Sequence, residues 1–222
     1  MYWEIWFNMN ENLNLLENKS NFEKIKIFVQ SKIKILVLII LSFIFIIIGI
    51  FYFNEVKKTK QIKLSENYNN LTIEYNLTKN KNLKSKFFEI IEKKDTTYSP
   101  LALYFVIDNN LNYSKEEINK YFDFLIDNLN TNKENTHLII YKKGLFNSEF
   151  EEENELLNIL KPVINSDSEW KVHSLYLLAE FFYSKKENKK AKEFYHKILN
   201  EKKTSNQMKF EIEKRLSRDL SE

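Results

Sequence analysis

A run of apolar residues from Ile35 to Phe53 constrains the fold of this 222-residue chain more than any other feature of its sequence. The run holds 19 residues without a charge. As a helix that rises 1.5 Å per residue it would extend about 28 Å, close to the roughly 30 Å of a bilayer's hydrocarbon core. A buried helix of a globular protein would keep a polar face, which this run lacks. We therefore predict a transmembrane helix over residues 35–53.

The residues before this span argue against a cleavable signal peptide. Such a peptide has a short charged region and an apolar stretch of about 7 to 15 residues. Here a 34-residue segment that includes Glu4, Glu11, Glu17 and Glu23 comes before a longer apolar stretch. The sequence instead predicts an uncleaved signal anchor, with residues 1–34 as a short cytoplasmic segment and residues 57–222 as a separate domain.

Orientation follows from the lengths of the two flanks, because the charges decide little. Five lysines precede the span and four follow it closely, so the positive-inside rule is nearly balanced. The short flank is therefore expected in the cytoplasm. The opening MYWEIWF places Trp3, Trp6 and Phe7 on one helical face. It leaves two interpretations open, a segment at the bilayer interface or an upstream extension with Met9 as the true start.

Composition excludes several classes of protein. The only glycines are Gly49 and Gly144, so the glycine-rich loops that bind phosphates and dinucleotides cannot form. The chain has no Cys, and its three His show no metal-ligand spacing. A net charge of +3 is too small for a dedicated nucleic-acid binder. We expect no enzyme, no metal, no cofactor and no small-molecule substrate, and we assign the acidic run Glu149 to Glu155 to the first turn of a helix.

Beyond the span, apolar residues recur at helical spacing and predict an all-α domain. Capping boxes, in which a Ser or Thr precedes a Glu or Gln by three residues, mark the expected helix starts. The four boxes are Ser114/Glu117, Ser148/Glu151, Ser166/Glu169 and Thr204/Gln207.

The spacing of the expected helices predicts a repeat. The first helices of successive pairs are expected near Gln61, Ser99, Asn135, Ser168 and Thr204, and their partners near Lys81, Ser114, Ser148 and Asn188. A helix pair recurring at about 34 residues is typical of a tetratricopeptide array. The best unit runs from Val172 to Lys203, with small Ala179 where the two helices would cross and small Ala191 in the second helix. The fold predicted is a degenerate tetratricopeptide-like solenoid of helix pairs, and a generic helical bundle is the alternative.

That alignment predicts a partner-binding groove in the last full repeat. Its lining would be His173, Tyr176, Glu180 and Tyr183, which share one face of a helix. The alternative is that the two tyrosines pack on the following helix. Within the span, Ser42 and Gly49 are the small residues, seven positions apart, and we predict that this face packs on a partner's membrane helix.

The layout also resembles a known bacterial family. The likeness rests on three stretches: the span with the charged EVKKTKQ after it, FFEIIEKK running into SPLALYFVIDNNL, and LYLLAEFFYSKKENKKAKEFYHKIL near the end. These are similar to membrane-anchored tetratricopeptide-like proteins typified by the ancillary subunit of the Sec translocon.

The resemblance implies a location and a function. It implies a single-pass protein of the bacterial inner membrane whose helical domain faces the periplasm. It also implies that the domain binds other proteins, namely translocon subunits, periplasmic chaperones or exported chains. The alternative function is a structural or assembly protein of the cell envelope, a partner of outer-membrane or cell-wall machinery.

Overall fold

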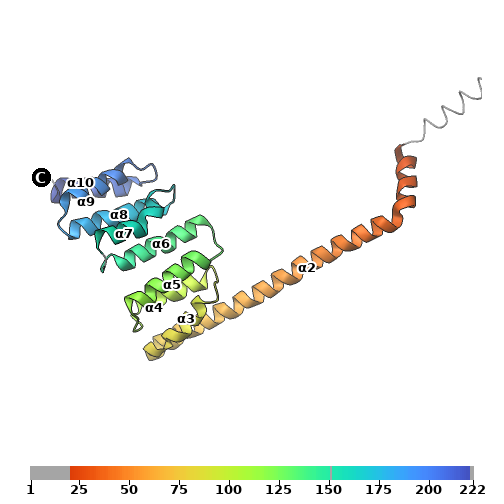
Figure 1. Cartoon of the computed structure of the whole chain (residues 1–222), viewed down its shortest axis with the longest axis horizontal. Coiled ribbons are helices and arrows are strands. Elements are labelled where there is room, and N and C mark those ends of the chain that lie inside the picture. The colour runs from red at the N-terminus through yellow and green to blue at the C-terminus, as the bar shows by residue number, and fades with distance from the viewer. Residues whose placement is uncertain (1–20, 151, 221–222) are drawn as a thin grey trace, which may run out of the picture. The chain divides into compact units, whose positions relative to one another are not determined.

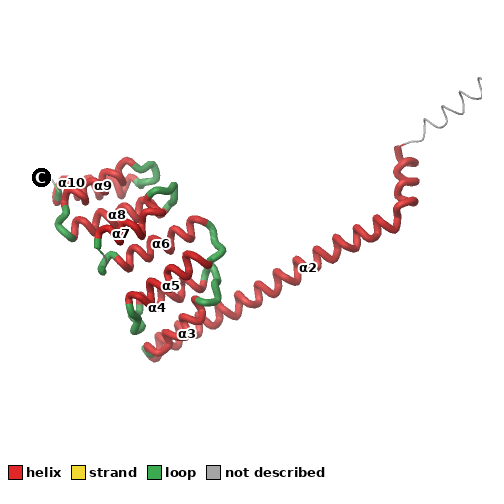
Figure 2. The backbone as a smooth tube through the Cα atoms, viewed as in Figure 1, coloured by secondary structure: helices red, strands yellow, loops and turns green. Residues whose placement is uncertain are grey.

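The computed structural model describes residues 21–150 and 152–220, and within them the chain is helical without a strand (Figures 1 and 2). The all-α prediction is confirmed for these residues. Part of the expected cytoplasmic segment, including Trp3, Trp6 and Phe7, lies outside them. The helices are α2 (Asn21–Thr78), η1 (Lys81–Leu83), α3 (Lys84–Ile91), α4 (Tyr98–Asp108), α5 (Lys115–Asn128), α6 (Lys133–Asn147), α7 (Glu153–Ile164), α8 (Trp170–Ser184), α9 (Asn188–Asn200) and α10 (Asn206–Asp219).

The predicted span forms part of α2. This helix is long and apolar enough to cross a membrane, and its most apolar window has no buried residue. Ser42 and Gly49 are both exposed, and no other atom lies near the position of a Cβ on Gly49. The packing of this face on another membrane helix therefore stays a prediction.

The expected helix start near Gln61 is wrong, because α2 continues through it to Thr78. The sequence explains this, since no Gly or Pro occurs between Gly49 and Pro100 to interrupt a helix. The helix ends where Lys79 adopts a positive φ of 53°. Asn80 then caps η1 by accepting a hydrogen bond from the backbone N–H of Asn82 at 3.0 Å.

The structure divides into two compact units between Lys60 and Gln61. In the second unit, successive helices from α3 to α10 pack against one another in chain order, and α6 also touches α8 (Figure 1). Buried side chains form two clusters, one from Leu71 to Ile139 and the other from Leu156 to Leu220. Each helix therefore packs mainly against its neighbours in the sequence.

Helix pairs in this unit recur at a nearly constant length. The first helices of the pairs begin at Tyr98, Lys133, Trp170 and Asn206, which are 35 to 37 residues apart. Several side-chain hydrogen bonds and ion pairs span nearly the same interval. Their separations run from 33 to 37 residues in Lys84–Glu117, Lys94–Asn128, Glu134–Ser168, Glu180–Arg215, Asp167–Lys203 and Glu153–Lys190. Others join residues 20 to 29 positions apart.

Of the predicted capping boxes, one is confirmed and the others are wrong where the structure describes them. Ser114 caps α5 by accepting a hydrogen bond from the N–H of Glu117 at 3.1 Å. Ser148 instead ends α6 and donates to the carbonyl of Leu145, and its expected partner, residue 151, lies outside the described residues. Ser166 donates to the carbonyl of Val163, and α8 begins only at Trp170. The cap of α10 is Ser205, one residue after the expected Thr204.

Candidate functional site

The four residues predicted to form a groove lie on α8, and the structure separates His173 from the others. His173 is exposed, and its ring lies beside Trp170 at 5.5 Å and Tyr141 at 6.1 Å between centroids. Tyr141 and Trp170 themselves stack at 5.5 Å. His173 therefore belongs to an aromatic group shared by α6 and α8.

Side chains of α9 and α10 cover much of the other three positions. Glu180 accepts a hydrogen bond from the Arg215 guanidinium at 2.7 Å and another from the Tyr195 hydroxyl. Arg215 also lies over the ring of Tyr183, 4.7 Å from its centroid. Tyr176 packs edge-on against Tyr195 at 6.2 Å. These contacts favour the alternative in which the tyrosines pack on neighbouring helices.

A hollow of about 230 Å³ remains beside Tyr176. Its other lining residues are Glu211, Ile212, Lys214, Arg215 and Arg218, all from α10. Partner binding at the predicted groove stays a prediction. The space available for it beside Tyr176 is this small hollow.

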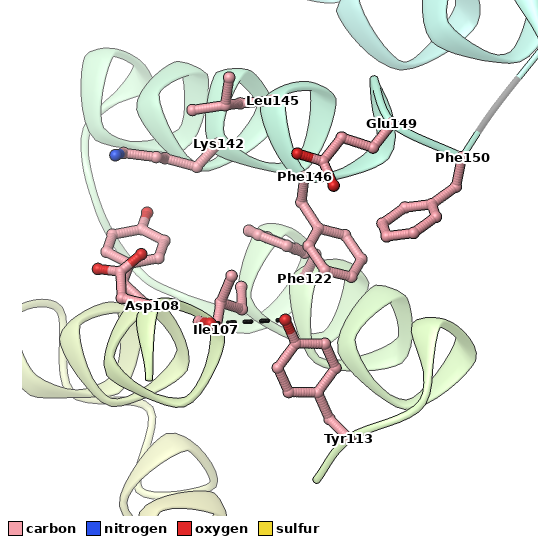
Figure 3. A pocket seen from close by; sticks show the side chains of 10 residues that line it. Ile107, Asp108, Tyr113, Phe122, Lys142, Leu145, Phe146, Glu149 and Phe150 are labelled. Atoms are coloured by element: carbon pink, nitrogen blue, oxygen red, sulfur yellow. Dashed lines mark hydrogen bonds between the residues drawn. The ribbon is translucent and has the colours of Figure 1, made fainter. Parts of the chain in front are cut away.

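A larger hollow of about 320 Å³ lies among α4, α5 and α6, where no site was predicted (Figure 3). Side chains from these three helices and from the segments that follow α4 and α6 converge on it. The lining consists of Tyr104, Ile107, Asp108, Tyr113, Phe122, Lys142, Leu145, Phe146, Glu149 and Phe150.

The apolar part of this lining is a connected set of aromatic rings. Phe122 is fully buried, and its ring lies 6.1 Å from that of Phe146. Phe146 in turn lies 6.0 Å from Tyr113 and 5.5 Å from Phe150. Phe150 and Leu145 remain 53% and 41% exposed. The hollow thus offers an open aromatic surface that the fold itself does not cover.

Tyr104 places a buried hydroxyl at this hollow without a hydrogen-bond partner in the structure. Burial raises the pKa of Tyr104, so the phenol stays protonated and keeps a hydrogen to donate. The ammonium of Lys142 lies over the aromatic ring of Tyr104, 5.5 Å from its centroid. A buried polar group left unpaired is costly, which makes Tyr104 a candidate for contact with a bound molecule.

Two carboxylates bring negative charge to the hollow. Asp108 and Glu149 are exposed, and neither forms an ion pair with another residue in the described part of the chain. The pKa of Tyr113 is raised chiefly by burial and further by the negative charges of Glu149 and Asp108. Both carboxylates therefore act electrostatically on the same ring.

Another hollow of about 230 Å³, which we call the second hollow, shares Tyr104 with the larger hollow. It is distinct from the hollow beside Tyr176. The second hollow lies toward the start of α4 and the loop before α6, and its lining includes Pro100, Leu101, Leu129 and Leu138. We call the larger hollow and the second hollow together the α4–α6 groove. Tyr104 is the residue that they have in common.

Groups suited to catalysis or metal binding do not gather in the described residues. These residues contain no cluster of three His, Asp or Glu that could hold a metal ion. His137 is buried, with Ser166 Oγ 3.5 Å from its Nδ1, but that hydroxyl donates to the carbonyl of Val163 at 2.7 Å. The pair therefore lacks the arrangement of a nucleophile activated by a base.

The groove left a weak signal in the sequence. Leu145 of α6 and Phe150, just after it, are large apolar residues that remain exposed. Glu149 was assigned to the first turn of a helix, but α7 begins only at Glu153. Glu149 is thereby free to line the groove.

Comparisons with protein-family models, with curated proteins and with solved structures gave no match. The function must therefore be argued from the groove and from the arrangement of the helices.

Proposed function

We propose that this protein is a membrane-tethered interaction module whose α4–α6 groove binds a segment of another protein. The observation that carries this proposal is the unpaired, buried hydroxyl of Tyr104 beside an open aromatic surface. Protein segments supply both complements, because their backbone carbonyls accept hydrogen bonds and their apolar side chains cover aromatic rings.

The lining of the groove suits binding better than catalysis. The larger hollow holds two phenols, two carboxylates and one ammonium, and the second hollow adds the hydroxyls of Thr96, Thr97 and Thr131 and the amide of Asn135. No hydrogen bond between these lining side chains joins a nucleophile to a base. Phe150 and Leu145 at the larger hollow remain exposed, which fits a surface that receives part of a larger molecule.

We infer that the helix pairs form a degenerate tetratricopeptide-like solenoid. Support comes from the 35 to 37 residues between first helices and from the hydrogen bonds that repeat at 33 to 37 residues. In such arrays each pair buries its apolar face only by stacking on its neighbour. The alternative of a generic bundle would not require contacts at one recurring interval.

We place this module at the bacterial inner membrane, with its N-terminus in the cytoplasm and its helical domain in the periplasm. There it would act as an ancillary factor of the Sec translocon and of periplasmic chaperones that assist exported proteins. The support is the resemblance of the layout, a single apolar helix followed by helix pairs. A partner role in outer-membrane or cell-wall assembly is the second candidate function.

Site-directed photocrosslinking in intact membranes tests the groove. A crosslinking amino acid at Leu145, which lines the groove, should form adducts with a defined protein partner. The same amino acid at Phe210, an apolar residue of α10 that is 66% exposed, is the matched control and should not. Mass spectrometry of the adducts then separates translocon subunits and chaperones from envelope-assembly factors.

Tyr104→Phe provides the second arm of this experiment. It removes only the unpaired hydroxyl, so the fold should be at least as stable as before while the Leu145 adducts weaken. Adducts of equal yield from Leu145 and Phe210, or none from Leu145, would show that the groove is not the binding surface.

A further inference from the structure

We propose that the occupant of the α4–α6 groove is a protein segment that carries a basic side chain, Lys or Arg, between apolar residues. This inference rests on the proposed function, because it names the chemistry of the segment bound at the same groove. It follows from the charge of the lining, from its rings and from its volume.

Charge is the first argument. The lining of the larger hollow has two carboxylates, Asp108 and Glu149, against one ammonium, Lys142, so the lining itself is net negative. The ammonium of Lys115 lies outside the lining, over Phe150 at 5.9 Å. In the described part of the chain neither carboxylate has a cationic partner within ion-pair distance. The pKa of Tyr113 is raised chiefly by burial, and the negative charges of Glu149 and Asp108 add to that effect. A cation bound beside the ring of Tyr113 would be attracted by both carboxylates.

The aromatic rings favour the same cation. A Lys or Arg over an aromatic face is attracted by the electrons of the ring. This chain already uses such contacts at the outer rings of the hollow, with Lys142 over Tyr104 at 5.5 Å and Lys115 over Phe150 at 5.9 Å. No such cation lies over Tyr113 or Phe146 among the described residues. These two rings are therefore the ones available to an incoming side chain.

Volume and hydrogen bonding extend the contact along the segment. About 320 Å³ is at the lower end of the range for binding pockets, which suits one long side chain with part of its neighbour. The unpaired hydroxyl of Tyr104 would donate to a backbone carbonyl of the segment. Beyond it, the second hollow beside Leu101 and Leu138 gives room for an apolar residue.

Peptide binding to the full-length protein in lipid nanodiscs tests this inference. The probes are two fluorescent nine-residue peptides, identical except that a central Arg between two Leu is replaced by citrulline, which has a similar shape and no charge. Fluorescence anisotropy should show about tenfold tighter binding of the Arg peptide, the scale expected from a charged contact with rings and carboxylates. Added salt should reduce this preference.

Matched variants assign the preference to the groove. Asp108→Asn with Glu149→Gln should remove it and leave both peptides at the affinity of the citrulline form. Asp127→Asn with Glu193→Gln removes the same charge from exposed residues outside the lining and should preserve it. Circular dichroism of each variant checks that the helices are intact.

Several outcomes would overturn the inference. These are equal binding of the two peptides, no binding of either, a preference that survives loss of Asp108 and Glu149, and equal binding to empty nanodiscs, which would assign the signal to lipid. If Leu145 still forms specific adducts in membranes, only the basic side chain is refuted. If those adducts are absent too, the proposed function fails with it.

Discussion

At the scale of single residues, the missing side chain of Gly144 sets how closely α6 approaches α7. A Cβ built on Gly144 would lie 2.4 Å from Cδ2 and 2.9 Å from Cγ of Leu160, which is fully buried. Leu160 would have to move within a packed core, where overpacking is costly. The glycine is therefore required by packing, because its φ is not positive.

We expect Gly144→Ala to lower the free energy of unfolding by about 1–3 kcal/mol, the usual cost of overpacking. Thermal or denaturant unfolding followed by circular dichroism measures this. Gly49→Ala is the matched control, since no atom lies within 4 Å of its added Cβ. The cost should disappear when Leu160→Ala makes room, and an equal cost in both backgrounds would contradict the steric explanation.

His137 supplies a prediction about pH. Burial lowers the pKa of His137 from its usual 6.5, the nearby Lys133 acts in the same direction, and the negative charge of Glu134 opposes both. The unfolded chain therefore binds this proton more readily than the folded one. The contribution of neutral His137 to stability is fully present above about pH 6.5 and is lost as the pH falls through the lowered pKa.

Accordingly, His137→Gln should flatten the dependence of the unfolding free energy on pH below about 6.5. The exposed His196→Gln is the control and should leave that slope unchanged. Denaturant titrations across this pH range provide the measurement. A variant slope equal to that of the wild type would show that His137 titrates alike in both states.

At the scale of elements, α10 covers the end of the helix-pair unit through Arg215. Its guanidinium pairs with Glu180 of α8 at 2.7 Å and lies over the ring of Tyr183. Both charged side chains are about 30% exposed, 27% for Arg215 and 31% for Glu180. One side chain thus joins α10 to α8 by two kinds of contact.

Removal of that side chain should weaken the docking of α10. We expect Arg215→Ala to cost about 1–2 kcal/mol, since it leaves the partly buried carboxylate of Glu180 without its ion-pair partner. Lys214→Ala, at an exposed neighbouring position, is the control and should change stability little. Hydrogen exchange of α10 amides should be faster in Arg215→Ala alone. If both variants behave alike, Arg215 does not hold the helix.

The helices were predictable because apolar residues recur at helical spacing, and in the span because the apolar run is long enough to cross a membrane. Their exact starts depended on competition between hydroxyl groups. Thr204 and Ser205 are both suitable caps. Thr204 instead donates to the carbonyl of Ile198 at 2.6 Å, so Ser205 caps α10. Ser148 ends one helix rather than beginning the next, because its hydroxyl donates backward to Leu145. Local patterns do not decide between such partners.

The α4–α6 groove was beyond sequence reasoning for a different reason. It depends on the space left among α4, α5 and α6, and the apolar pattern specifies which residues are buried rather than how far apart the helices lie. The unpaired hydroxyl of Tyr104 and the rings of Phe146 and Phe150 can be recognised as parts of one groove only when that space is known. On α8, the sequence likewise did not show that Arg215 of α10 lies over Tyr183.

At the scale of the whole molecule, topology is the first property to test. A reporter that is active only outside the cytoplasm, fused after Glu222, should be active, because the short flank of the span is expected to stay in the cytoplasm. A reporter active only in the cytoplasm, fused at the same position, serves as the control. Activity of the second reporter alone would reverse the orientation.

The recurring interval between helix pairs has a consequence for the synthesis of this protein. In the described chain, the hydrogen bonds between side chains join residues at most 37 positions apart. Folding of such a chain never waits for contacts from its far end, and low contact order of this kind gives fast folding. In the topology proposed above, the domain would emerge across the membrane from its N-terminal end, and each helix pair could form as soon as the next has appeared, which would leave little unfolded chain exposed.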